Sequence, residues 1–148
     1  MSIISLTYSS RYTGPKYQLI IDLQSIFDTS IVNNITHNIS GVLLYCNNHF
    51  LQTIEGNRPN VEKLFEKISH DSRHSDITTL LSHAIERRMY PEWNMQPINI
   101  DNIRLFNNDN LLQLKSFLTR TLQLDAPTYH QHLNLLLDDP NVSRLLVA

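Results

Sequence analysis

Apolar and polar residues alternate along the stretch Ile39–Gly56, which reads ISGVLLYCNNHFLQTIEG. The pair Asn47–Asn48 interrupts it with a turn signal, so the pattern predicts two strands joined as a hairpin. Successive side chains of a strand point to opposite faces, which places Gln52 in an apolar row between Phe50 and Ile54. The opposite face carries Leu51, Thr53 and Glu55. A buried carboxamide without partners costs about 1–3 kcal/mol, so Gln52 needs either a neighbour in the fold or a ligand.

The rest of the first hundred residues divides into strand-like and helical segments. Helical periodicity predicts one helix from Lys16 to near Asn34 and a second that opens at Asn57–Pro59. A polar turn is expected over Asp71–Asp76. Strands are expected over Ile3–Ser9, Ile77–Ile85 and Trp93–Ile100, with Trp93 and Met95 on the same face of the last one. The order β-α-β-β-α-β with an added strand predicts an α+β protein with a ferredoxin-like sheet that carries both helices on one face.

From Asp101 onward the pattern changes to short helical segments. Asn107–Asp109 can cap a helix, and shorter helices are expected to start near Asp125–Pro127 and Asp139–Pro140. Their apolar positions are Leu111, Leu114, Phe117, Leu118, Leu133, Leu136, Leu137, Val142, Leu145 and Leu146. We expect these C-terminal helices to pack on the open face of the sheet, because an uncovered apolar face would be a large exposed patch. The predicted domains are therefore residues 1–100 and a helical extension over residues 101–148.

Composition narrows the function classes. The 148 residues are 41% hydrophobic and 18% charged with a net charge of −2, which is ordinary for a globular domain and argues against a broad nucleic-acid-binding face. Three glycines argue against a phosphate-binding loop, and the single Cys46 excludes an intramolecular disulfide. Only the pairs His70/His74 and His130/His132 approach ligand spacing, and no constellation of Cys or carboxylate residues joins them, so we expect no metal site. Without a long apolar run or a basic leader, a cytoplasmic protein without membrane contact is expected.

Tyr8 and Gln52 form the most informative pair. The first and third strands of a ferredoxin-like sheet are its central pair, so the two side chains are expected to meet. On the pattern alone, a Tyr–Gln hydrogen bond that only satisfies the core is the simpler interpretation. The same holds for Asn33 and Asn34, because Asn is common at helix ends.

The motifs SLTYSS, NNITHNISGVLLY, FLQTIEG, DSRHSDI and EWNMQPINI follow one another between Ile3 and Ile100. In this order, and with FLQ-x-x-EG followed by W-x-M at its usual distance, the segment resembles the BLUF family of blue-light sensors that use FAD. The resemblance covers about two thirds of the chain. It implies the ferredoxin-like sheet expected above, with a flavin ring held between the two helices.

The resemblance also implies roles for individual residues. Tyr8 would be the photoactive tyrosine, Gln52 the glutamine that rearranges, and Asn34, with Asn33 beside it, the ligand of the pyrimidine edge. The remaining implied positions are Ile26 and Ser30 on the first helix, Asp71, Arg73 and His74 near the flavin, and Trp93 and Met95 on the responsive strand. FAD is the expected cofactor, FMN a possible one, and the expected partners are a second copy of the chain and a downstream protein.

Three functions follow from this interpretation. The first is a short photoreceptor without enzymatic turnover, because nothing after Ile100 resembles a cyclase or phosphodiesterase. The second is a ferredoxin-like interaction module that has lost its chromophore. The third is an acylphosphatase-like hydrolase, for which Arg11 is the candidate phosphate ligand but lacks the glycines to build a phosphate-binding loop.

Overall fold

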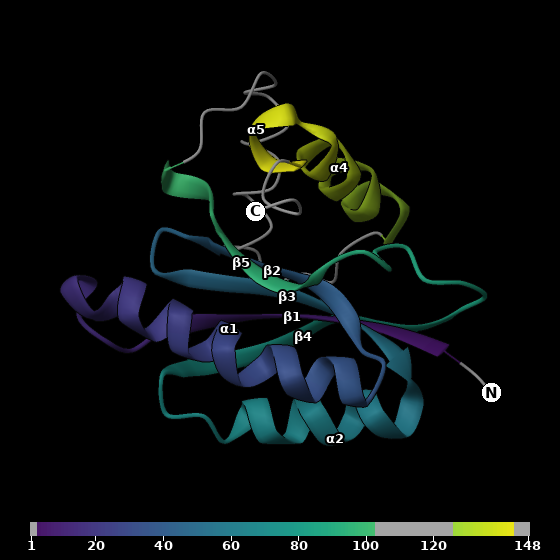
Figure 1. The fold of residues 1–148 in the computed structure, drawn as a ribbon, viewed down its shortest axis with the longest axis horizontal. Helices are drawn as coiled ribbons and strands as arrows, with labels where there is room; N and C mark the ends of the chain where they lie inside the picture. The colour runs from purple at the N-terminus through teal and green to yellow at the C-terminus, as the bar shows by residue number, and fades with distance from the viewer. Residues whose placement is uncertain (1–2, 103–125, 144–148) are drawn as a thin grey trace.

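A computed structural model describes residues 3–102 and 126–143, which form a five-stranded sheet in the order β4-β1-β3-β2-β5. Helices α1 and α2 lie on one face of this sheet and α4 lies on the other (Figure 1). The strands are β1 (Ile3–Tyr12), β2 (Ser40–Cys46), β3 (His49–Asn57), β4 (His74–Ile85) and β5 (Asn94–Asn99). The helices are α1 (Leu19–Thr36), α2 (Arg58–Ser69), α4 (Ala126–Asp138) and α5 (Pro140–Ser143), with single 3-10 turns at Lys16–Gln18 and Ile100–Asn102. The ferredoxin-like α+β prediction is confirmed.

The β2–β3 hairpin forms where the sequence predicts it. Asn47 and Asn48 both have positive φ, 47° and 68°, which is what a two-residue hairpin turn of type I′ requires. β3 lies between β1 and β2, and its residues from Phe50 to Gly56 are all buried. β3 is therefore the central strand on which both layers of the molecule are built.

The strand register places Tyr8 of β1 directly opposite Gln52 of β3. Tyr8 belongs to a buried cluster on the face of the sheet that α1 and α2 cover, together with Leu6, Ile54 and Met95. We call this face the helix side and the opposite face the α4 side. The helical stripe predicted for α2 packs against it through Val61, Leu64, Phe65 and Ile68. This face therefore has an apolar frame around one polar pair.

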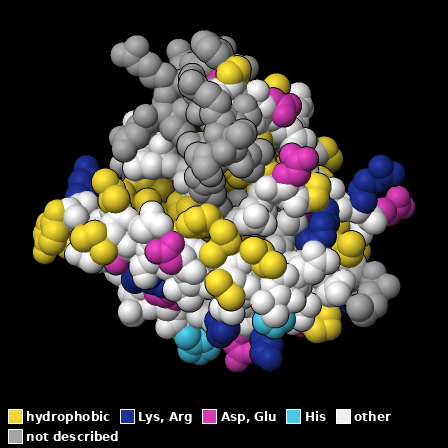
Figure 2. Space-filling view, in the orientation of Figure 1, with side chains coloured by type: hydrophobic (Ala, Val, Ile, Leu, Met, Phe, Trp, Pro, Cys, Tyr) yellow, Lys and Arg dark blue, Asp and Glu magenta, His cyan; other side chains and the backbone are white. Residues whose placement is uncertain are grey.

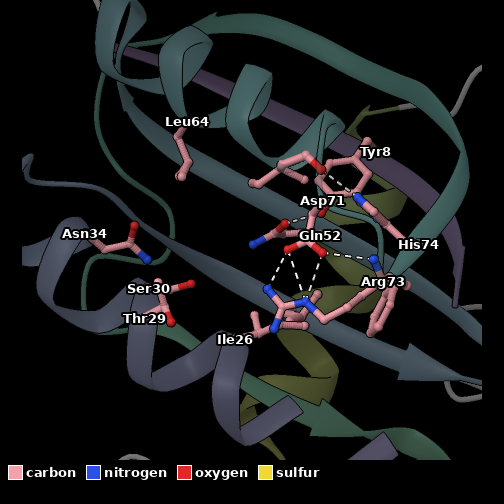
Figure 3. A pocket seen from close by; sticks show the side chains of 13 residues that line it. Tyr8, Ile26, Thr29, Ser30, Asn34, Gln52, Leu64, Asp71, Arg73 and His74 are labelled. Atoms are coloured by element: carbon pink, nitrogen blue, oxygen red, sulfur yellow. Dashed lines mark hydrogen bonds and ion pairs between the residues drawn. The ribbon is translucent and has the colours of Figure 1, made fainter. Parts of the chain in front are cut away.

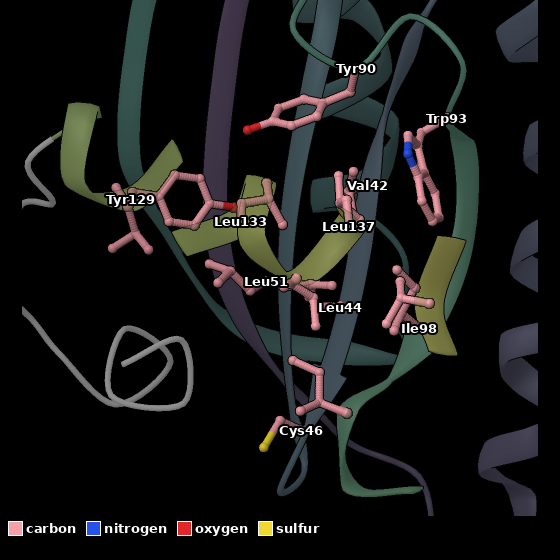
Figure 4. Close-up of a cluster of buried hydrophobic side chains, with 14 of the residues drawn as sticks. Val42, Leu44, Cys46, Leu51, Tyr90, Trp93, Ile98, Tyr129, Leu133 and Leu137 are labelled. Carbon is pink, nitrogen blue, oxygen red and sulfur yellow. The ribbon is translucent and has the colours of Figure 1, made fainter. Parts of the chain in front are cut away.

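The opposite face of the sheet packs against α4. Val42, Leu44 and Leu51 from the sheet contact Leu133 and Leu137 from the helix in one buried cluster (Figure 4). Helices α4 and α5 begin near the prolines at which the sequence predicts helix starts. The predicted positions Asn107–Asp109, Leu111, Leu114, Phe117, Leu118, Asp125, Leu145 and Leu146 lie outside the described residues.

Two strand boundaries differ from the prediction. β1 continues to Tyr12, three residues beyond the predicted end, and β4 begins at His74, so the predicted polar turn through Asp76 is wrong from His74 onward. Tyr12 pairs with His74 in the sheet, and Arg11 forms an ion pair with Asp76 at 3.0 Å. These contacts join residues more than sixty positions apart, which local periodicity cannot reveal.

The shared face predicted for Trp93 and Met95 is wrong. Trp93 precedes β5 and packs in the α4-side cluster, whereas Met95 belongs to the helix-side cluster. Met95 has φ of 64°, and the register between β2 and β5 shifts between Gly41 and Leu43. A left-handed residue at an irregular pairing breaks the period-two alternation on which the prediction rested.

Gly41 permits the close packing at this irregularity. Its φ is +152°, and a Cβ added to it would lie 1.9 Å from the carbonyl oxygen of Thr53 and 2.5 Å from Cε of Met95. Both distances are far inside van der Waals contact. Only glycine therefore allows β2 to pass between β3 and the Met95 side chain.

Among the described residues, none of the helices is both long enough and apolar enough to cross a lipid bilayer.

Candidate functional site

A pocket lies between α1 and α2, above the middle of the sheet (Figure 3). Its wall combines apolar side chains with a few polar ones that converge from β1, β3, α1 and the segment after α2. The lining residues are Tyr8, Ile26, Thr29, Ser30, Asn34, Leu43, Phe50, Gln52, Leu64, Ile68, Asp71, Arg73 and His74. This composition is typical of a small-molecule site.

Most of the residues singled out from the sequence meet in this pocket. They are Tyr8, Ile26, Ser30, Asn34, Gln52, Asp71, Arg73 and His74. Asn33 instead lines a neighbouring hollow with His37, Asn60 and Lys67, because adjacent residues of a helix point about 100° apart. Trp93 lies across the sheet, and Met95 is not a lining residue but contacts Gln52.

Tyr8 and Gln52 are joined by a hydrogen bond in which the phenol Oη donates to Gln52 Oε1. The amide nitrogen of Gln52 points the other way and contacts Sδ of Met95 at 3.4 Å. Both side chains are buried, with exposed fractions of 3% and 6%. A thioether is a weak acceptor, so the N–H groups of Gln52 are bonded less strongly here than they would be to an oxygen acceptor.

The environment of Tyr8 keeps its phenol protonated. Burial raises the pKa of Tyr8 far above its ordinary value, and the nearby negative charge of Asp71 raises it further. The ring of Phe65 lies 5.3 Å away between centroids and that of His74 lies 6.2 Å away. Tyr8 is thus a packed hydrogen-bond donor at neutral pH.

Asn34 carries an unsatisfied carboxamide. It lies near the end of α1 with only 1% of its surface exposed, and both Nδ2 and Oδ1 lack a hydrogen-bond partner among the described residues. In Figure 3 this amide projects into the space between the two helices. Because each buried unpaired group costs about 1–3 kcal/mol, this amide is suited to a ligand that presents a donor and an acceptor side by side.

Arg73 and Asp71 form an ion pair at the edge of the pocket. Arg73 Nε donates to Asp71 Oδ1 at 2.9 Å, and Nη1 donates to Ser25 Oγ of α1 at 3.3 Å. Hydrogen bonds from Arg73 hold the pKa of Asp71 below its usual value, and the same pair raises the pKa of Arg73. The guanidinium therefore bridges the segment after α2 to α1 across the entrance.

His74 is fixed by both ring nitrogens. Nε2 lies 2.7 Å from the carbonyl oxygen of Ile68 and must donate to it, while Nδ1 lies 2.7 Å from Ser10 Oγ. These contacts tie the start of β4 to β1 and to the end of α2. His74 holds the pocket wall in place.

Five lining residues were not singled out from the sequence. They are Thr29, Leu43, Phe50, Leu64 and Ile68. The signal was present for most of them, because Leu64 and Ile68 belong to the apolar stripe of α2 and Phe50 shares a strand face with Gln52.

Within residues 3–102 and 126–143, we find no group of three His, Cys, Asp or Glu side chains that could hold a metal ion.

The chain was compared with known proteins. The family model BLUF, described as sensors of blue-light using FAD, matches residues 3–96. Photoactivated adenylate cyclase subunit beta of Euglena gracilis is 37% identical over 120 residues, which are 78% of this chain and 14% of that protein. Subunit alpha of the same organism is 39% identical over 88 residues, 60% of this chain and 8% of that protein. The chain therefore spans only a small part of these relatives.

Solved structures show the same similarity over most of the chain. The dark state of BlrB, a BLUF protein, superposes with a TM-score of 0.74 at 32% identity and covers 89% of this chain and 95% of BlrB. The photo-activated state of BlsA superposes with a TM-score of 0.71 at 29% identity and covers 99% and 96% of the two chains.

Proposed function

The chain belongs to the BLUF family of blue-light sensors, and from this membership we propose that it is a flavin photoreceptor in which light rearranges the hydrogen bonds of Gln52. The observation that carries the proposal is the buried Tyr8–Gln52 hydrogen bond in a pocket that is also lined by the Asn34 amide, which has no partner among the described residues. Tyr8 could give an electron and its proton to an excited cofactor, the Gln52 amide could rotate, and the Asn34 amide could bind a ligand.

The pocket residues fit a flavin. The pyrimidine edge of a flavin alternates carbonyl acceptors with an N–H donor, and the carboxamide of Asn34 complements such an edge where a carboxylate would not. Ile26 and Ser30 from α1 and Leu64 and Ile68 from α2 would flank the ring system. We propose FAD, as in the description of the family, with FMN as the alternative; chromatography of the cofactor released by heat distinguishes the two.

A bound flavin would supply the absorption of blue light and, once excited, a strong one-electron oxidant. Tyr8 is placed to give up an electron, and its proton already points at Gln52 Oε1. Rotation of the Gln52 amide would exchange its oxygen and nitrogen between Tyr8 and Met95. This exchange releases the N–H donors from the weak thioether and makes them available to a better acceptor.

We propose that the output is a change in protein contacts and not a catalytic turnover. Met95 contacts Gln52 and would therefore lose or change this contact when Gln52 rearranges. It lies on β5, the last strand of the proposed domain 1–100. Beyond it, we propose that residues 101–148 form a helical extension that packs on the sheet and reports the change to a downstream protein. A cytoplasmic location is part of the same proposal and is tested by cell fractionation.

The proposal is tested by two substitutions that keep the packing. Tyr8→Phe removes the phenol proton, and Gln52→Leu removes every donor while preserving bulk. Both variants should bind flavin and appear yellow, yet neither should show the reversible red shift of the visible spectrum in blue light. The control is Tyr17→Phe, because Tyr17 is 85% exposed and far from the pocket wall.

Each outcome has a meaning. A normal red shift in either variant would refute the role of that residue. A wild-type protein that is colourless after production with abundant flavin would favour the chromophore-free interaction module.

A further inference from the structure

Helix α1 has an exposed apolar face in addition to its buried one. The buried side of the helix includes Leu19, Leu23 and Asn34, which face the sheet and the pocket. On the outer side, hydrophobic side chains lie in the open (Figure 2). Their exposed fractions are 85% for Tyr17, 74% for Ile20, 60% for Ile21, 65% for Val32 and 65% for Ile35.

These side chains form one continuous stripe. At about 100° per residue, positions 20, 21, 24, 28, 32 and 35 project from the same side of α1, and Tyr17 lies in the 3-10 turn directly before this helix. We call these seven residues the α1 stripe; the two polar members are Gln24 and Asp28. Asp28 is the one formally charged side chain among the seven, and the stripe contains no Lys or Arg. An interfacial helix that binds anionic lipid usually carries basic residues, so the composition favours a protein partner.

Six of the seven stripe residues, all except Ile21, lie symmetrically about residue 26. Tyr17 and Ile35 lie nine positions on either side of this point, Ile20 and Val32 lie six, and Gln24 and Asp28 lie two. When two copies of a helix pair antiparallel about a two-fold axis at residue 26, residue 20 meets residue 32 of the other copy, and residue 24 meets residue 28. Each apolar end would then meet an apolar end, and each amide a carboxylate.

We propose that the α1 stripe is the contact through which two copies of this chain associate as an antiparallel, two-fold symmetric dimer. Gln24 Nε2 donates to Asp28 Oδ1 of its own helix at 2.9 Å, in an exposed position. In the dimer the same amide and carboxylate exchange partners across the axis, so each Asp28 keeps one amide donor while apolar residues at both ends leave water. The proposal rests on the surface of α1 and not on the bound flavin.

The size of the contact sets its strength. The 18 residues of α1 form a helix about 27 Å long at 1.5 Å per residue. A single pair of helices of this length buries less surface than a standard stable interface, so we expect a dimer that dissociates on dilution in the micromolar range.

The first experiment measures mass against concentration by sedimentation equilibrium of the full chain. The wild type should pass from monomer to dimer as its concentration rises, and Ile20→Glu with Val32→Glu should raise the dissociation constant at least about 100-fold, since each interface then holds four carboxylates in apolar contacts. The control, Thr78→Glu with Ser82→Glu, adds the same charge at exposed positions of the edge strand β4 and should associate like the wild type. A wild type that stays monomeric up to about 1 mM overturns the proposal.

The second experiment tests the register. Ile20→Cys and Val32→Cys are made separately, mixed and oxidised; Cys46 is 2% exposed, and the wild type run in parallel measures its background. The antiparallel pairing predicts a disulfide-linked product between the two different variants and little product from either variant alone. Cross-linking of Ile20→Cys with itself would indicate parallel helices and overturn the arrangement. The red shift in blue light should be unchanged in the Glu variants, so failure of this dimer and failure of the photoreceptor proposal are separate results.

Discussion

The two faces of β3 carry polar side chains in alternation, and the two faces satisfy them in opposite ways. On the α4 side, Thr53 bonds to Thr7 at 2.9 Å and to Tyr129 at 2.7 Å. On the same side, Glu55 accepts hydrogen bonds from the backbone N–H groups of Met89 at 2.7 Å and Tyr90 at 2.8 Å. Each of these polar groups is matched by a group of the same chain.

By comparison with Thr53 and Glu55, two polar side chains on the α1–α2 side of the sheet are matched less well. The N–H donors of Gln52 have a thioether for a partner, and the amide of Asn34 across the pocket has none among the described residues. The difference separates two uses of buried polarity. A polar group matched within the chain contributes to folding, whereas an unmatched group beside a pocket costs folding energy that a ligand can recover. Substitutions on the two faces should therefore affect different measurements.

The largest effect on folding is expected from Glu55→Ala. Glu55 is 0% exposed, and its carboxylate accepts hydrogen bonds from two backbone N–H groups. The substitution leaves both N–H groups without this acceptor and should lower the free energy of unfolding by about 2–4 kcal/mol. Urea denaturation of the flavin-loaded protein measures it. The matched control is Glu62→Ala, because Glu62 lies in an exposed ion pair with Arg58 and should change stability by less than about 0.5 kcal/mol. Equal effects of the two substitutions would show that the hydrogen bonds of Glu55 to Met89 and Tyr90 do not stabilise the fold.

Asn34→Leu should produce the reverse pattern. Since the amide has no partner among the described residues, its loss should leave the flavin-free protein as stable as the wild type, or more stable by about 1 kcal/mol. Flavin affinity should fall about 10- to 100-fold, which corresponds to two lost hydrogen bonds. Fluorescence titration with FAD and urea denaturation without FAD give the two numbers. A variant that binds flavin normally but unfolds early would make Asn34 a structural residue.

Tyr129→Phe probes the α4 side more gently. It removes the hydroxyl that bonds to Thr53 but keeps the ring, and the cost should be about 1 kcal/mol in the free energy of unfolding. The visible spectrum and the red shift should not change, because the hydroxyl lies across the sheet from the pocket. A changed red shift would show that the two faces are coupled through β3.

A single imidazole on the α4 side should make the stability depend on pH. Burial lowers the pKa of His130 to about 4, and the neighbouring His83 lowers it as well. In the unfolded chain the imidazole has a pKa near 6.5, so below this pH the unfolded state binds a proton that the folded state does not bind until about pH 4. The contribution of His130 to the free energy of unfolding should therefore be greatest above pH 6.5 and should decline as the pH falls toward 4. His130→Gln should flatten part of this decline in denaturation curves measured at several pH values, whereas the exposed His70→Gln should not. An unchanged pH profile in His130→Gln would assign the decline to other groups.

Sequence patterns were enough where one local rule decides the outcome. The alternation in β3 located Gln52, Thr53 and Glu55 on their faces, and the Asn47–Asn48 pair located the hairpin. The central pairing of the first and third strands then brought Tyr8 to Gln52.

The remaining features depend on contacts between distant segments. Glu55 gave no sign that it would be buried, because its partners are N–H groups of a loop more than thirty residues away. Trp93 and Met95 separate because one backbone angle and one register shift override the alternation, and neither is encoded by a recognisable residue type at β5 itself. Asn33 and Asn34 are neighbours in sequence and both line the hollow beside the pocket, yet only Asn34 also lines the pocket itself.

Gly41 shows how a mutational map of this protein should be interpreted. A side chain there would collide with the backbone of Thr53 and with Met95, which lies against Gln52. A screen for light response would therefore score nearly every substitution at Gly41 as a loss, as it would at Tyr8 or Gln52. The two kinds of loss would differ in origin: at Tyr8 the proposed reacting group would be missing, whereas at Gly41 a side chain would fill the space beside Thr53 and Met95. Sensitivity in such a screen identifies the photochemical residues only after positions that tolerate no Cβ have been set aside.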